Sequence, residues 1–166
     1  MQTKVKLLGH PVHQMLVVFP LGLLATAVLF DVIYLASERP MMAAVAYWMI
    51  VAGIVGGLLA APFGWLDWGS IPRDTRAKRV GLVHGLGNVL VVLLFIGSWW
   101  LRRDMPEAPA GVAHVLSFLG AGLSMVTAWL GGELVDRLGV GVYEDANVNA
   151  SSSLHERKVR EPHAAR

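Results

Sequence analysis

The sequence predicts an all-α integral membrane protein, a four-helix bundle with both termini on the same side of the membrane. Hydrophobic residues make up 55% of the 166 residues and charged residues only 16%, whereas a soluble domain carries about 25% charged residues. The apolar residues fall into four blocks, 11–36, 43–68, 77–101 and 112–130. Each block is close to the ~20 residues that a helix needs to cross a bilayer, and blocks of this length satisfy their backbone hydrogen bonds in lipid as helices.

Polar and helix-breaking residues separate these blocks. Segment 38–40 divides the first two, 70–74 the second and third, and 102–109 the last two. Glycines close the last predicted helix: Gly131, Gly132, Gly139 and Gly141. We therefore expect a transmembrane domain over residues 1–142 and a polar, flexible cytoplasmic tail over 143–166. The absence of cysteine excludes disulfide scaffolds, thiolate metal sites and covalently attached c-type haem.

The basic residues predict the orientation. Four crossings place both termini and the middle connection on one side, which carries eleven of the fourteen basic residues. They are Lys4, Lys6, Arg73, Arg76, Lys78, Arg79, Arg137, Arg157, Lys158, Arg160 and Arg166. Because cytoplasmic segments are enriched in Lys and Arg, we expect both termini in the cytoplasm and the chain in the bacterial inner membrane. Topology accounts for these charges, so the expected partner is the lipid bilayer and no nucleic acid.

Small and polar residues of the second block share one stripe. Gly53, Gly57, Ala60, Gly64 and Asp67 are spaced by four, three, four and three residues. Such small residues let membrane helices approach closely, so Asp67 is predicted on a packing face. The spacing from Gly53 to Gly57 supports close pairing within the bundle or between two copies of the chain, so a homo-oligomer stays open.

The remaining strongly polar residues of the first three blocks follow the same helical rhythm, and depth divides the polar residues into two groups. One group lies in the cytoplasmic half: His10, His13, Asp67, His84 and Asn88. The other group is Asp31 and His114, at similar depth in the outer half. Ionisable residues inside a membrane indicate function. Because an unpaired buried charge is costly, we expect Asp31 and His114 to form a structural pair. Glu133 lies off the stripe, and its membership of the cytoplasmic group is open.

Several motifs resemble a known family. His10-Pro11-Val12-His13 with residues 17–23 is similar to the opening signature of a bacterial membrane family, domain of unknown function 2231. Segments 60–68, 84–88 and 131–142 extend the resemblance to about residues 9–142. The family usually has a proline where this chain has Gln14. The resemblance implies a four-helix membrane domain. It also implies a redox role, because relatives occur with dehydrogenase, Rieske-type or cytochrome c modules.

The leading functional hypothesis is a membrane redox protein with a b-type haem between the first and third helices. Haem iron accepts imidazole ligands from facing helices of a bundle. His13 and His84 are the natural axial pair, with His10, Asn88 and Asp67 around them. Electrons would pass to or from a partner protein or a quinone.

Two features beside His84 fit a haem, and each has a plainer explanation. Gly81, Gly85 and Gly87 leave room for a flat macrocycle, but glycines also serve helix packing. The basic residues at 76, 78 and 79 would meet the propionates, but the topology rule also demands them.

Two alternatives stay open, and with them the question whether the protein is an enzyme. A metal-dependent membrane enzyme would bind zinc or non-haem iron through His10, His13, His84 and Asp67, with Glu133 as acid or base. No serine or threonine stands out as a nucleophile. A structural accessory subunit would hold no cofactor and would use its His–Asp contacts to fix helix packing.

Overall fold

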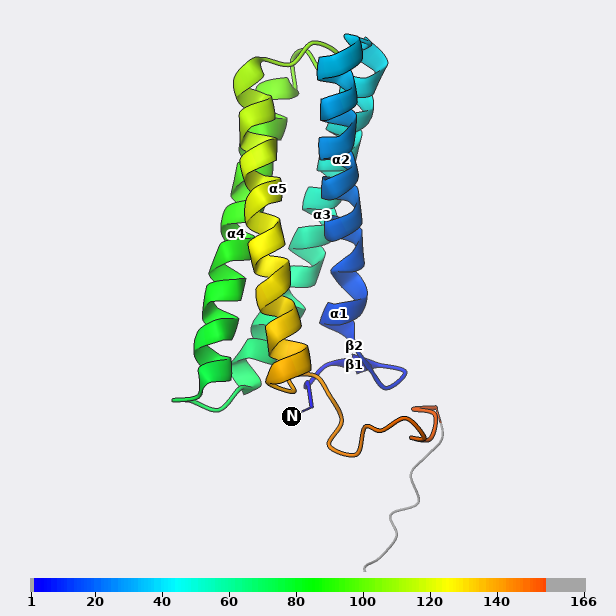
Figure 1. The fold of residues 1–166 in the computed structure, drawn as a ribbon, viewed down its shortest axis with the longest axis vertical. Helices are drawn as coiled ribbons and strands as arrows, with labels where there is room; N and C mark the ends of the chain where they lie inside the picture. The colour runs from blue at the N-terminus through cyan, green and yellow to red at the C-terminus, as the bar shows by residue number, and fades with distance from the viewer. Residues whose placement is uncertain (1, 155–166) are drawn as a thin grey trace, which may run out of the picture.

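The computed structural model, which describes residues 2–154, is an elongated bundle of helices (Figure 1). Its elements are β1 (Lys6–Leu7), β2 (His10–Pro11), α1 (Val12–Leu16), α2 (Val18–Ser37), α3 (Pro40–Ser70), α4 (Arg76–Arg102), α5 (Gly111–Gly132) and the π-helical turn η1 (Glu133–Arg137). Among these described residues, four helical segments are long and apolar enough to span a membrane: Val12–Ser37, Pro40–Ser70, Arg76–Arg102 and Gly111–Arg137. The predicted all-α fold with four helices able to span a membrane is therefore confirmed.

The two ends of the bundle differ in their number of Lys and Arg residues. The first described residues, the α3–α4 connection and residues 138–154 lie together at one end (Figure 1), which we call the basic end. The α2–α3 and α4–α5 connections lie at the opposite end. Residues 155–166 of the predicted tail lie outside the described residues, as do the basic residues counted there.

The boundaries of two helices differ from the sequence prediction. The first span is interrupted at Val17, because Pro20 has no N–H to continue the α-helical ladder at that turn. The last span continues beyond Gly132 into η1 and ends where Gly139 and Gly141 adopt positive φ angles of 64° and 83°, a conformation that favours glycine.

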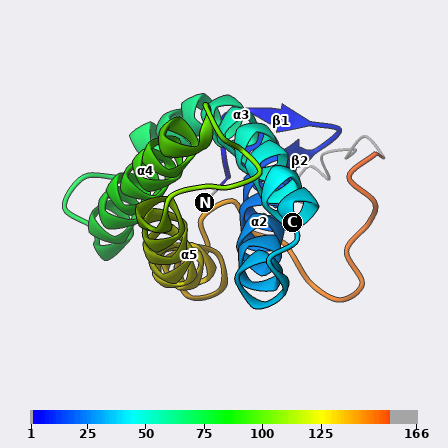
Figure 2. The ribbon, with the colours of Figure 1, turned by 90° about the horizontal axis from the view of Figure 1, so that it is seen from above.

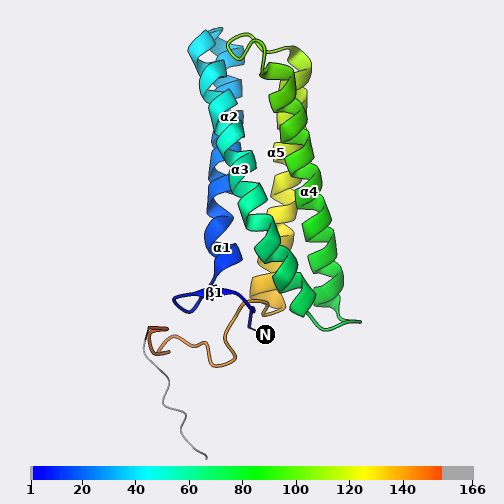
Figure 3. The same ribbon diagram turned by 180° about the vertical axis from the view of Figure 1, so that it is seen from behind.

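The bundle consists of two helical hairpins, α2 with α3 and α4 with α5. They join mainly where α3 meets α4, while α2 and α5 touch less extensively. Figure 2 shows this arrangement along the bundle axis, and Figure 3 shows α3 and α4 from behind. The central hydrophobic cluster takes two side chains from each of three helices: Leu24, Ala27, Ile50, Ile54, Val91 and Phe95.

Close packing of α3 on its neighbours uses Gly53 and Gly57 of the predicted stripe, together with Gly56. A Cβ atom on Gly53 would lie 2.5 Å from Leu24 Cδ2, and one on Gly56 would lie 3.1 Å from Pro20 Cδ. On Gly57 it would lie 3.3 Å from Val92 Cγ2. These glycines therefore serve contacts within the bundle.

Gly53→Ala is expected to lower the free energy of unfolding by about 1–3 kcal/mol, because the new methyl group overpacks the buried Leu24. Unfolding in detergent micelles, followed by helical circular dichroism, measures the effect. Gly22→Ala is the matched control, because no atom lies within 4 Å of the Cβ position at Gly22. Equal stability of the two variants would contradict the packing role of Gly53.

Candidate functional site

His13 on α1 is held against α3 near the basic end. Its Nδ1 lies 3.1 Å from the carbonyl oxygen of Ala60. A Cβ atom on Gly64 would lie 2.7 Å from His13 Cε1, so only glycine leaves room for the ring there. Because a carbonyl oxygen only accepts, Nδ1–H donates this bond, and in the neutral ring Nε2 keeps its lone pair.

His84 on α4 is held in the same way against α5. Its Nδ1 lies 2.9 Å from the carbonyl oxygen of Thr127, and a Cβ atom on Gly131 would lie 3.1 Å from His84 Cε1. Asn88 Nδ2 lies 3.1 Å from His84 Nε2 and donates to it. The Thr127 hydroxyl donates to Asn88 Oδ1 at 2.9 Å. This closed ring of hydrogen bonds fixes the orientation of the imidazole. Thr127 was not predicted.

Asp67 lies beside His13 at the end of α3. Its side chain is buried, and within residues 2–154 its Oδ1 has no hydrogen-bond partner. The backbone N–H of Lys4 and the His13 ring lie near its carboxylate, and His13 is also within electrostatic range of His84. The structure therefore gathers His13, His84, Asn88 and Asp67 in one half of the bundle.

His10 does not belong to this group of side chains. It lies in β2 and is exposed, with Nε2 3.4 Å from the Ser153 hydroxyl. The predicted alignment of His10 and His13 on one helix face is absent, because the chain is extended at His10 and the helix begins only at Val12.

The glycines and basic residues predicted around His84 take part in helix packing, an ion pair and a contact with Trp68. Cβ atoms on Gly81 and Gly87 would lie 2.9 Å from Trp68 and 2.6 Å from Thr127, whereas Gly85 faces open space. Arg76 forms an ion pair with Glu133 at 2.6 Å, which places Glu133 at the rim of this end. Lys78 donates to the Trp68 carbonyl oxygen at 2.7 Å and covers its ring.

The polar side chains at this end do not form a metal-binding cluster in the part of the chain that the structure describes. Among residues 2–154, no three His, Asp or Glu side chains gather closely enough to hold a metal ion. Both imidazoles have Nδ1 on a backbone carbonyl, and Nε2 of His84 accepts a hydrogen bond from Asn88.

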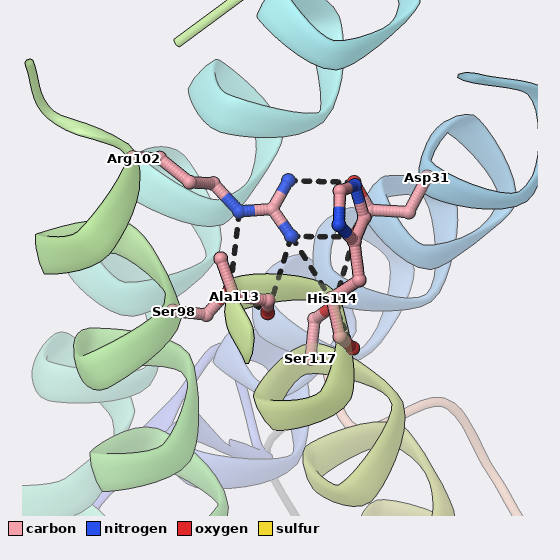
Figure 4. Close-up of polar contacts among 6 residues, drawn as sticks. All are labelled: Asp31, Ser98, Arg102, Ala113, His114 and Ser117. Carbon is pink, nitrogen blue, oxygen red and sulfur yellow. Dashed lines mark hydrogen bonds and ion pairs between the residues drawn. The ribbon is translucent and has the colours of Figure 1, made fainter. Parts of the chain in front are cut away.

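A second polar cluster lies inside the opposite half of the bundle (Figure 4). Arg102 Nη1 and Nη2 donate to Asp31 Oδ1 and Oδ2 at 2.6 and 2.8 Å. Arg102 Nε donates to the Ser98 hydroxyl at 3.1 Å, and the Ser117 hydroxyl donates to Asp31 Oδ2 at 2.8 Å. Asp31 and Arg102 are both fully buried. The cluster therefore ties α2, α4 and α5 together.

The geometry of this pair offsets the cost of burying it. A buried ion pair compensates for lost hydration only when its contacts are close and its remaining polar atoms are satisfied. The two parallel bonds between Arg102 and Asp31 are the strong bidentate form, and the serine hydroxyls satisfy further atoms. The opposite charges cancel, so the cluster adds no net charge to the interior.

The His114 ring borders this cluster without a hydrogen bond to it, although the His114 carbonyl oxygen accepts from the Ser117 hydroxyl at 3.0 Å. Its Nε2 lies 3.8 Å from Asp31 Oδ1, and neither ring nitrogen has a hydrogen-bond partner among the described residues. The ring stacks on Tyr34 at 5.6 Å between centroids. The predicted partners Asp31 and His114 are thus neighbours, but the main partner of Asp31 is Arg102.

The spacing of the sequence predicts that Arg102 faces the bundle, although the predicted third block ended before it. The stripe of the third block runs through Val91, Phe95 and Ser98, and the next step of four residues is Arg102. Because Arg102 is charged, the sequence prediction assigned it to the connection 102–109 and not to the third helix. In the structure α4 continues through Arg102, and the side chain turns into the bundle.

The comparisons with known proteins agree with the resemblance seen in the sequence. A family model described as "Predicted membrane protein (DUF2231)" matches residues 9–144. No curated protein and no solved structure matches the chain.

Proposed function

The chain belongs to the DUF2231 family of predicted membrane proteins, and we propose that it is a membrane-embedded redox protein that binds a b-type haem between α1 and α4. His13 and His84 are the proposed axial ligands. One observation supports this choice most directly. Both imidazoles have Nδ1 on a backbone carbonyl, Ala60 for one and Thr127 for the other, which is how proteins orient histidines that ligate through Nε2.

Neighbouring residues prepare the two rings for this role. Gly64 and Gly131 leave room for the imidazoles, as described above. Asn88 occupies His84 Nε2 at 3.1 Å, so ligation there would replace that hydrogen bond. The Asn88 amide would keep its contact with the Thr127 hydroxyl. When bound, the haem would supply one-electron chemistry, and a quinone or a partner protein would exchange the electrons.

The visible spectrum of the protein purified from membranes tests the proposal. A Soret band that shifts on reduction, with non-covalent haem in about equimolar amount, is the expected result. A colourless preparation should regain the same spectrum when titrated with haem. A folded protein that takes up no haem would contradict the proposal. Stoichiometric zinc or iron without haem would favour the metal-dependent enzyme.

We also propose that the basic end of the bundle faces the cytoplasm of a bacterial cell, because Lys and Arg mark cytoplasmic segments. In the described residues that end carries the basic residues of segments 2–11, 71–79 and 133–137. Reporter proteins fused to either terminus are expected to read cytoplasmic, and one inserted in 103–109 is expected to read external. A C-terminal fusion that reads external would reverse the assigned orientation.

A further inference from the structure

A small hairpin, β1 and β2, precedes the first membrane span and projects sideways from the foot of α1 (Figures 1 and 3). Lys6 pairs with Pro11 and Leu7 with His10, so Leu8 and Gly9 form the tip. Leu7 and Leu8 are 53% and 69% exposed. The hairpin thus presents two adjacent apolar side chains outside the helical bundle.

The turn is unusual for its sequence. Leu8 and Gly9 have φ angles of 52° and 85°, as in a hairpin turn that normally carries Asn-Gly or Asp-Gly. Leucine is disfavoured there, because its Cβ atom crowds the following carbonyl oxygen. In water, asparagine at position 8 would suit both the backbone and the solvent. Apolar surroundings would favour the leucine side chain at this exposed tip over a polar one.

The tip also lies close in sequence to the start of the first span. The first span begins at Val12, directly after Pro11. Anionic headgroups attract basic side chains, and Lys4 and Lys6 lie on the segment that carries the tip. Apolar and basic residues in combination are typical of segments that bind a membrane surface.

Contacts from the C-terminal segment hold the hairpin through its backbone. The Tyr143 hydroxyl donates to the Gly9 carbonyl oxygen at 2.6 Å, and the Ser153 hydroxyl donates to that of Leu8 at 3.1 Å. Lys6 Nζ lies 4.0 Å from the centroid of the Tyr143 ring. These contacts leave the side chains of Leu7 and Leu8 exposed.

We propose that the hairpin is a membrane-surface anchor whose leucines, Leu7 and Leu8, insert into the interface of the same bilayer that the helices span. The anchor holds the chain where it enters α1. The proposal does not depend on haem binding.

Spin labelling tests the insertion directly, because the chain has no cysteine. Leu7→Cys and Leu8→Cys are labelled with a nitroxide, and the protein is reconstituted into phosphatidylcholine–phosphatidylglycerol vesicles. Leu86→Cys, exposed on α4, is the lipid-facing reference, and Arg73→Cys, exposed in the α3–α4 connection, is the aqueous reference. Collision of the label with oxygen, which dissolves in lipid, is compared with collision with a water-soluble nickel chelate.

The oxygen-to-nickel collision ratio at positions 7 and 8 is expected to exceed that at 73 severalfold and to approach that at 86. Adding Leu8→Asn to the variant labelled at position 7 should lower the ratio toward the aqueous reference. A ratio equal to that at 73 would overturn the proposal. Low collision with both reagents would also overturn it, because protein would then cover the leucines.

Discussion

Arg102→Met is expected to lower the free energy of unfolding by about 3–5 kcal/mol, because it leaves Asp31 as an uncompensated charge in the bundle interior. The wild-type carboxylate receives two bonds from Arg102, at 2.6 and 2.8 Å, and no water reaches it, since both side chains are fully buried. Denaturant titration of the protein in detergent micelles, followed by circular dichroism, measures the loss.

Two variants distinguish the ion pair from a general effect of arginine. Arg103→Met is the matched control, because Arg103 is exposed and lies 3.5 Å from an exposed Asp104; exposed pairs contribute at most about 1 kcal/mol. The double variant Asp31→Asn with Arg102→Met should recover part of the lost stability, because no charge remains buried. Wild-type stability of Arg102→Met alone would show that the pair does not hold the helices together.

His84→Ala is expected to abolish haem binding, because it removes one of the two proposed axial ligands. Asn88→Ala should retain haem with unchanged or higher affinity, because the wild-type hydrogen bond from Asn88 to His84 Nε2 must break before that nitrogen can ligate iron. The Soret absorbance of the purified variants and titration with haem measure both effects. In Asn88→Ala, the His84 ring would be oriented by the Thr127 carbonyl oxygen alone.

His10→Ala is the matched histidine control for this pair of variants. His10 lies on the exposed strand β2, so its replacement should leave the spectrum unchanged. If His84→Ala keeps the full Soret band, the ligand assignment is wrong even if the protein binds haem. If His84→Ala and His10→Ala both lose haem, the effect is not specific to the site.

The membrane fold could be predicted from the sequence because its signals are local. Each span is an apolar block whose backbone hydrogen bonds are satisfied within the helix itself, so length and hydropathy indicate it without knowledge of its neighbours. The stripes of small and polar residues are also local signals, because the helical spacing within one segment places them on one face. Glycines such as Gly53 and Gly64 lie on packing faces in the structure, as their spacing predicted.

The partners of the polar residues depended on the tertiary structure. Helical spacing indicates the face of a residue, but the contact between two faces also depends on the depth and rotation of both helices. Arg102 pairs with Asp31 because α4 extends one turn beyond Ser98 and the long side chain reaches back into the bundle. His10 does not lie with His13 and His84 as predicted, because the chain is extended at His10.

By itself, the sequence determined that this chain is a four-helix membrane protein with two polar groups inside its spans, because hydrophobicity and periodicity are properties of single segments. Only the tertiary structure decided that Asp31 accepts hydrogen bonds from Arg102 and that His84 donates to the Thr127 carbonyl oxygen. It also decided that Leu7 and Leu8 of the hairpin are exposed within the described residues. Each of these contacts joins residues far apart in the chain or depends on what packs nearby. Their geometry exists only once the helices have docked.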